Sequence, residues 1–251
     1  MRAFKRSLAL AGGALVLAAL PAAAEDLTIV FKDSRGATET QYYTAGKMRN
    51  AAGDHDSIMD FSNGTITTID HKRKEYSQVT LDQLEAAMKQ ASAQMEQSMA
   101  SVPPAMRQKM EQMMGGAVGE VTVTRGGTRK VAGYDTQQYT VTMGDSIKNE
   151  LWNTTALQIP IDPAQFRKMA GFSGSFAGGP MMRGMARMAE KMKEVQGLTL
   201  AQSTSVKMMG RANETSREAV EVKKGTVPAD TFAVPAGYKK VESPMLKMGR
   251  Q

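Results

Sequence analysis

The sequence predicts an α+β protein built on an antiparallel β-sheet, and three observations support this prediction. Runs of alternating apolar and polar residues, typical of half-buried strands, follow one another closely through residues 27–79. Stretches with apolar residues at every third or fourth position, typical of helices, interrupt the strand patterns between residues 81 and 195. Strand patterns return after these stretches, as at 134–143 and 199–209. Meandering strands with inserted helices are typical of the α+β class.

The first half is predicted to be a meander of about six strands, judged from the spacing of its turns. Asn63-Gly64 separates two β-type runs and is a strong hairpin signal, because both residues accept positive φ. The predicted strands cover 27–32, 39–44, 47–50, 57–61, 65–70 and 75–79.

Helices are predicted where the meander ends. Thr80 is expected to cap a helix from Leu81 to about Met99, with Asp82 and Gln83 in its first turn. Pro103-Pro104 interrupts the helical pattern. Further helices are predicted at 105–114, 164–170 and 181–195, with a mobile Gly- and Ser-rich loop over 171–180.

The remaining segments have strand patterns. A turn is expected at Gly126-Gly127, where two glycines separate two β-type runs. The predicted strands are 119–125, 128–131, 134–143, 146–154, 199–209, 217–223 and 231–241.

The N-terminus has the pattern of a secretory signal peptide. A basic head contains Arg2, Lys5 and Arg6, an apolar run covers 8–20, and three alanines end at Ala24. We expect residues 1–24 to be cleaved after Ala24, residues 25–242 to form a single domain and residues 243–251 to be a loose tail. The run is shorter than the about 20 residues of a spanning helix, which leaves a retained anchor as the weaker alternative. No later stretch is long and apolar enough to span a bilayer, so the prediction is a soluble periplasmic protein, with extracellular release as the alternative.

Composition narrows the function classes. Cleavage would remove three positive charges and lower the formal net charge from +7 to +4, a weak basic excess that does not favour nucleic acid as a partner. The chain has no Cys, which excludes disulfides, thiol catalysis and Cys metal sites. Its most unusual feature is the presence of 21 Met residues.

Several short motifs, in this order, resemble those of an exported bacterial family. The motifs are Tyr43–Arg49, Ile66–Tyr76, Gly127–Tyr139, Glu150–Trp152 and Val227–Lys239. Together they resemble the DUF4412 family, a domain of unknown function, and more distantly the LolA/LolB superfamily of lipoprotein carriers. The resemblance implies a strongly curved antiparallel sheet, an open half-barrel, with the Met-rich helices over its concave face. In the lipoprotein carriers that concavity holds acyl chains.

The methionines lie at helical spacing and allow three interpretations. They can form the face that packs on the sheet, because Met is apolar and unbranched. They can form an adaptable surface for an apolar ligand. They can also bind Cu(I) or Ag(I), because thioethers favour soft metals. The candidate residues for an apolar cavity are Met88, Met95, Met99, Met106, Met110, Met181, Met185, Met188, Met192 and Trp152. The metal alternative rests on Met181, Met182, Met185 and Met188.

Two polar clusters each have a functional and a structural interpretation. Asp54-His55-Asp56 could bind a divalent ion or could form a solvated turn. The basic run Lys72–Lys74 could contact phosphate headgroups or could be the charged tip of a hairpin.

Catalysis has little support in the sequence, which contains no Gly-x-Ser-x-Gly elbow and no phosphate-binding loop. We therefore predict a non-catalytic periplasmic binding protein for an apolar or lipid-like ligand, without a cofactor. The alternatives are a Cu(I) or Ag(I) binding protein and a module that binds another envelope protein.

Overall fold

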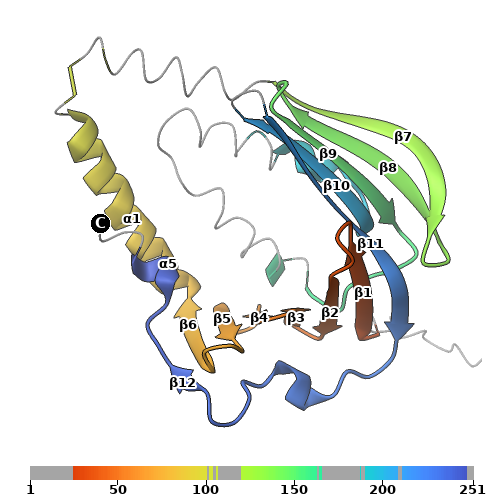
Figure 1. Cartoon of the computed structure of the whole chain (residues 1–251), viewed down its shortest axis with the longest axis horizontal. Helices are drawn as coiled ribbons and strands as arrows, with labels where there is room; N and C mark the ends of the chain where they lie inside the picture. The colour runs from red at the N-terminus through yellow and green to blue at the C-terminus, as the bar shows by residue number, and fades with distance from the viewer. Residues whose placement is uncertain are drawn as a thin grey trace, which may run out of the picture.

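The computed structural model describes residues 25–100, 102–103, 106, 120–162, 164–165, 187, 190–208 and 211–247. Its framework is one 12-stranded sheet with the order β12-β6-β5-β4-β3-β2-β1-β11-β10-β9-β8-β7. The sheet curves, so that β1–β6 form a floor and β7–β11 rise as a wall (Figure 1). The curved antiparallel sheet that the sequence predicts is confirmed.

The first half is an antiparallel meander of six strands. Each predicted strand is present, and its ends agree with the prediction within two residues, because local turns set them. The strands are β1 (Leu27–Asp33), β2 (Thr38–Thr44), β3 (Lys47–Ala52), β4 (His55–Asp60), β5 (Thr65–Asp70) and β6 (Glu75–Thr80).

Helix α1 (Leu81–Ala100) follows β6 without a break. The backbone N–H of Gln83 donates to Thr80 Oγ1 at 3.1 Å, and the N–H of Thr80 donates to Gln83 Oε1 at 3.0 Å. These reciprocal bonds form a capping box, which satisfies two backbone donors at the helix start. The predicted cap is thus confirmed.

The second half forms the wall of the sheet. Its strands are β7 (Val121–Val131), β8 (Tyr134–Met143), β9 (Ile147–Thr154), β10 (Leu198–Met208) and β11 (Arg211–Lys224). β11 pairs with β10 on one side and antiparallel to β1 on the other, which joins the two halves of the chain.

The turn predicted at Gly126-Gly127 is wrong, because β7 continues through these residues with a shift of register between Arg125 and Thr128. The side chain of Gln137 on β8 donates to the carbonyls of Gly126 at 2.7 Å and Gly127 at 3.0 Å. These bonds keep the irregular segment on the neighbouring strand, as in a β-bulge.

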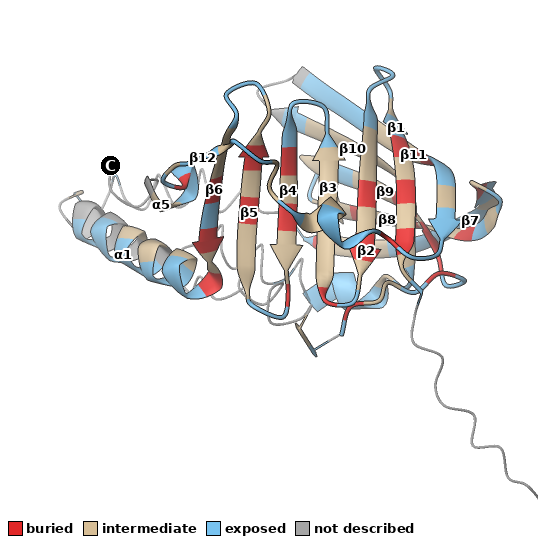
Figure 2. Cartoon of the chain, turned by 90° about the horizontal axis from the view of Figure 1, so that it is seen from below, coloured by how far each residue is buried: buried red, intermediate tan, exposed pale blue. Residues whose placement is uncertain are grey.

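The strand predicted over 231–241 is also wrong. This part contains a short 3-10 helix, η2 (Ala229–Phe232), and only a two-residue strand, β12 (Lys239–Lys240), which pairs parallel to β6. Pro228 and Pro235 have no N–H to donate to a ladder, which disfavours a continuous strand. Residues 225–243, here called the C-terminal strap, run across one face of the floor (Figure 2).

The segment after the strap also differs from the prediction. Residues Pro244–Lys247, part of the predicted loose tail, form helix α5, which contacts α1. Within the described residues, no helix combines the length and apolarity needed to cross a bilayer.

The strap covers the outer face of the floor, and the main core lies against the opposite, inner face. The residue pairs of the floor alternate between these faces, so Arg49 and Asp56 face the strap while their neighbours face inward. The main core gathers buried residues from β1, β2, β7, β10 and β11, from the turn after β4 and from the segment after β9: Leu27, Ile29, Phe31, Tyr43, Phe61, Val131, Leu157, Ile161, Leu200, Ala201 and Ala219.

Candidate functional site

A row of apolar side chains crosses the inner face of all six floor strands. The strand register places its members directly opposite one another, one per strand. The row is Leu27, Tyr43, Met48, Met59, Ile66 and Val79. Side chains opposite one another in adjacent strands lie in contact range, so these six form a continuous apolar stripe.

The stripe differs in burial along its length. Leu27 and Val79, at its ends, are 1% and 2% exposed. Tyr43, the second member, is also buried, whereas the third to fifth members, Met48, Met59 and Ile66, are only half-buried. Met48 and Met59 pack partly against the main core. The centre of the stripe therefore offers apolar surface that is not fully used in packing.

The inner face of β2–β6 becomes more polar along the strands. Two residues beyond the apolar stripe, a row of neutral polar residues crosses the floor: Gln41, Asn50, Ser57, Thr68 and Ser77. Two residues further on, the row is mainly charged or ionisable: Glu39, Ala52, His55, Asp70 and Glu75. One face thus runs from apolar to charged over three rows.

A hydrogen-bonded chain follows this gradient along β2. The hydroxyl of Tyr43 donates to Gln41 Oε1 at 2.7 Å, and Gln41 Nε2 donates to Glu39 Oε1 at 2.7 Å. Glu39 also accepts from Arg217 Nη1 at 2.5 Å. The Arg217 guanidinium lies 4.8 Å from the centre of the Phe31 ring. Arg217 of β11 is thereby fixed at the charged end of the face.

Burial raises the pKa of Tyr43 to about 12, although the positive charge of Arg217 acts in the opposite direction. Because the pKa of Tyr43 is raised, the unfolded chain loses the tyrosine proton at a lower pH than the folded chain does. The stability that protonated Tyr43 contributes is therefore fully present below pH 10, the ordinary tyrosine pKa, and is lost as the pH rises through about 12. We expect the wild-type free energy of unfolding to fall by up to about 3 kcal/mol more than that of Tyr43→Phe over this range. Denaturant titrations of both proteins at several pH values measure the difference. Parallel pH curves would contradict the prediction.

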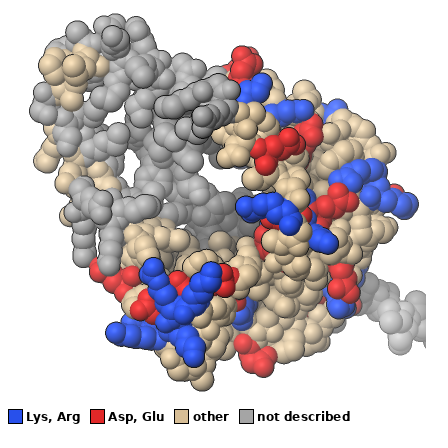
Figure 3. Space-filling view, in the orientation of Figure 1, with Lys and Arg blue, Asp and Glu red and all other residues tan. Residues whose placement is uncertain are grey.

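Two adjoining hollows of about 280 and 310 Å³ lie where β1 ends against β10 and β11. They share Asp33, Gln202, Ser216 and Arg217. The first is further lined by Lys32, Ser34, Arg129, Trp152, Ala201, Ser203 and Glu218, and the second by Thr204 and Thr215. Figure 3 shows basic and acidic side chains interleaved at the right of the view, where β7–β11 lie.

Trp152, one of the predicted cavity residues, lines the first of these hollows. The Arg129 guanidinium lies 4.6 Å from the centre of the Trp152 ring. Arg129 also binds both carboxylate oxygens of Glu218, at 3.1 and 2.8 Å. The surroundings are more polar than an apolar cavity would require, and ligand binding by Trp152 stays a prediction.

Most of the predicted methionines cannot be placed. Met106 is 62% exposed, and Met192, in the 3-10 helix η1 (Met192–Glu194), is 36% exposed. The side chains of Met88, Met95 and Met99 and the whole of Met110, Met181, Met182, Met185 and Met188 lie outside the described residues. Their roles in an apolar cavity or in metal binding therefore stay predictions, as does the placement of the Met-rich helices.

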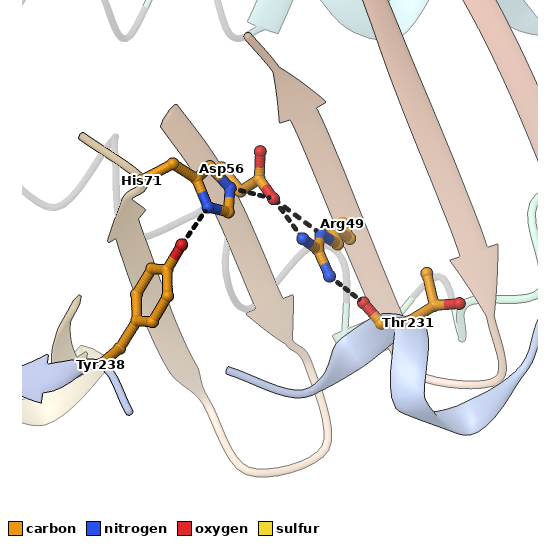
Figure 4. A network of polar contacts seen from close by, with 5 residues as sticks. All are labelled: Arg49, Asp56, His71, Thr231 and Tyr238. Atoms are coloured by element: carbon orange, nitrogen blue, oxygen red, sulfur yellow. Dashed lines mark hydrogen bonds and ion pairs between the residues drawn. The ribbon is translucent and has the colours of Figure 1, made fainter. Parts of the chain in front are cut away.

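On the outer face, a polar network attaches the strap to the floor (Figure 4). Asp56 is 4% exposed and accepts from Arg49, whose Nε lies 3.0 Å from Asp56 Oδ2. His71 Nε2 lies 3.0 Å from the same oxygen, and His71 Nδ1 lies 2.8 Å from the hydroxyl of Tyr238 in the strap. Arg49 donates in addition to the carbonyl of Thr231.

The first predicted polar cluster, Asp54-His55-Asp56, is divided by this arrangement, and Asp54 contacts the second cluster. Asp56 lies beneath the strap, whereas Asp54 pairs with Lys72 at 2.6 Å. In the described ranges, no three or more His, Asp or Glu side chains converge as metal ligands would. Arg73 lies 3.7 Å from Asp70, so two of the three basic residues at the hairpin tip have acidic partners.

The sequence interpretation missed the apolar stripe and Arg217. The sequence contains a signal for the stripe, because its short hairpin turns fix which residues of adjacent strands lie opposite one another. Arg217 had none, since its partner Glu39 is 178 positions away.

A family model, described as Domain of unknown function (DUF4412), matches residues 91–238. No curated protein sequence matches the chain.

Three solved structures match the chain at low sequence identity and low TM-score. An uncharacterized conserved protein from Thermus thermophilus has a TM-score of 0.45 at 6% identity, covering 88% of this chain and 91% of that one. The Pseudomonas aeruginosa MucA/MucB complex has 0.36 at 13% identity, covering 85% of this chain and 57% of that one. A putative outer membrane lipoprotein-sorting protein domain from Vibrio parahaemolyticus has 0.16 at 10% identity, covering 83% and 87%. At these TM-scores the matches support no conclusion about the fold or the function.

Proposed function

We propose that this chain, which belongs to the DUF4412 family, is a non-catalytic binding protein that holds an apolar or lipid-like ligand on the inner face of its sheet. The proposal rests mainly on one observation, the apolar stripe whose central residues Met48, Met59 and Ile66 are only half-buried.

Burial of apolar surface would drive the binding. Each methylene group that leaves water for an apolar surface contributes about 0.8 kcal/mol, so even a short alkyl segment along the stripe gains several kcal/mol. The adjacent thioethers of Met48 and Met59 suit a ligand of variable shape, because unbranched Met side chains repack easily.

The proposed location is the periplasm. It rests on the order of basic, apolar and small residues in positions 1–24, which is the pattern of a cleaved secretory signal. A binding protein in that compartment would meet lipids and lipid-like molecules of the envelope.

The stripe can be tested by changing two residues together. The double variant Met48→Gln, Met59→Gln is expected to weaken binding of a hydrophobic fluorescent probe at least about tenfold, because amides replace thioethers at the ligand surface. Probe titrations, with circular dichroism to verify folding, measure the effect.

Val220→Gln is the matched control, because Val220 is an apolar residue of β11 that is 57% exposed and lies outside the stripe. It is expected to leave probe binding unchanged. Equal binding by the wild type and a folded double variant would count against the stripe as the ligand site.

A further inference from the structure

We propose that the row of neutral polar residues beside the apolar stripe binds an uncharged headgroup with a hydroxyl donor, and that Asn50 is its main acceptor. This inference rests on the proposed function and specifies the ligand as an amphipathic molecule. Its alkyl chain would lie on the stripe, and its headgroup would lie on the adjacent row. This neutral polar row consists of Gln41, Asn50, Ser57, Thr68 and Ser77.

The side chain of Asn50 has an acceptor without a donor. Its Oδ1 is buried and has no hydrogen-bond partner among the described residues. The adjacent Gln41 does not supply the donor, because its Nε2 donates to Glu39 at 2.7 Å. A buried carbonyl oxygen without a donor raises the free energy of the folded protein. A ligand hydroxyl that donates to Asn50 would remove this penalty, which favours a headgroup that can donate over one that cannot.

Two hydroxyl groups continue the row from Asn50. Ser57 of β4 lies directly opposite Asn50, and Thr68 of β5 lies opposite Ser57. Both residues are half-buried, and within the described ranges neither side chain forms a hydrogen bond. A hydroxyl can both donate and accept, so these two side chains are suited to a second polar group of the same headgroup.

The stripe and the neutral polar row are close enough for one small ligand. Met48 and Asn50 lie two residues apart on the same face of β3, and Met59 and Ser57 have the same relation on β4. Two strand residues span about 7 Å, and no other row of this face lies between them. A molecule whose alkyl chain covers the two thioethers can therefore place its headgroup on Asn50 and Ser57.

The immediate surroundings of Asn50 and Ser57 favour an uncharged headgroup. Their neighbours on this face include no Lys, Arg, Asp or Glu. The neighbours are Met48 and Ala52 on β3, Met59 and His55 on β4, Gln41 on β2 and Thr68 on β5. A charged headgroup placed here would leave water without gaining an adjacent opposite charge, which is unfavourable.

The nearest carboxylates of this face disfavour an anion and already have donors. Glu39 and Asp70 lie in the next row, opposite Ala52 and His55. Glu39 accepts from the side chain of Arg217, and Asp70 accepts from a backbone N–H in its own turn. These carboxylates would repel a carboxylate or phosphate headgroup, and neither needs a cation from the ligand.

The test measures the affinity of three dodecyl ligands for residues 25–251 by isothermal titration calorimetry below the critical micelle concentration. 1-O-Dodecylglycerol has the chain and two hydroxyl donors. Its dimethyl ether keeps the chain and the oxygens but has no donor. Dodecanoate has the chain and a charged headgroup that only accepts. We expect dodecylglycerol to bind about tenfold more tightly than either of the other two, because it alone can donate to a buried acceptor.

Asn50→Leu is expected to abolish the preference for dodecylglycerol over its dimethyl ether, because the unpaired acceptor is gone. It should not lower the free energy of unfolding, since Oδ1 of Asn50 has no hydrogen bond to lose. Gln78→Leu is the matched control, because Gln78 is an exposed amide on the opposite face of β6, and it should keep the tenfold preference. Ser57→Ala, expected to reduce the preference about threefold, keeps the test decisive if Asn50→Leu disturbs folding.

The outcomes separate this inference from the proposed function. Equal affinities of the wild type for dodecylglycerol and its dimethyl ether, both weakened in Met48→Gln, Met59→Gln, would overturn the headgroup site and leave the apolar stripe standing. Tighter binding of dodecanoate than of dodecylglycerol would also overturn the headgroup site. A tenfold preference that persists in Asn50→Leu would overturn the role of Asn50. No binding of any of the three ligands to the wild type would overturn both proposals.

Discussion

Asp56→Ala is expected to lower the free energy of unfolding by about 3–5 kcal/mol, because it leaves Arg49 and His71 without their shared partner in a shielded place. The Asp56 side chain is 4% exposed and that of Arg49 is 15% exposed. Removing one member of a buried ion pair leaves an uncompensated charge, which is more harmful than the loss of the contact itself. Urea denaturation followed by circular dichroism measures the change.

Asp54→Asn provides the control. Asp54 also forms an ion pair, with Lys72, but their side chains are 50% and 72% exposed. Exposed pairs contribute between about 0 and 1 kcal/mol, so this variant should unfold almost as the wild type does. If the two variants had equal stability, the outer-face network would not hold the strap as described.

Gly197→Ala is expected to lower the free energy of unfolding by about 2–5 kcal/mol. Gly197 lies just before β10 with φ of +84°, and a Cβ there would lie 2.4 Å from the carbonyl oxygen of Thr154. Thr154 is 1% exposed at the end of β9, so backbone on both sides would have to shift. Thermal and urea unfolding of the variant measure the loss.

Gly133→Ala separates the penalty for a positive φ from the penalty for the close approach of a Cβ to neighbouring backbone. Gly133 has the same φ of +84°, but a Cβ there has no atom within 4 Å. It should therefore show only the conformational penalty of about 1–2 kcal/mol. A loss at Gly133 as large as at Gly197 would mean that the close approach to Thr154 is unimportant.

Local features of the sequence predicted much of the sheet. The ends of β5 and β8 agree to the residue, because Asn63-Gly64 and the alternation after Gly133 are signals within a few positions. The cap formed by Thr80 and Gln83 is equally local.

The errors arose where distant residues decide the structure. The bulge at Gly126-Gly127 depends on Gln137 in the next strand. The strap follows the outer face because Tyr238 reaches His71, which lies 167 positions earlier. The candidate site also depends on residues far apart in the sequence, since Glu39 and Arg217 meet only after β1 pairs with β11.

The pairing of β1 with β11 also determines when the fold can be completed. Leu27 of β1 pairs with Lys224 of β11, so β1 cannot complete its pairing until β11 has been synthesised. At a synthesis rate of about 5–20 residues per second, that delay is roughly 10–40 s. During this time the hairpins of the floor can close, but one edge of β1 lacks its partner strand β11. Leu27, Ile29 and Phe31 also lack the core residues that the later strands supply. Such a high contact order predicts slow folding and a need for protection from aggregation until the C-terminal residues are available.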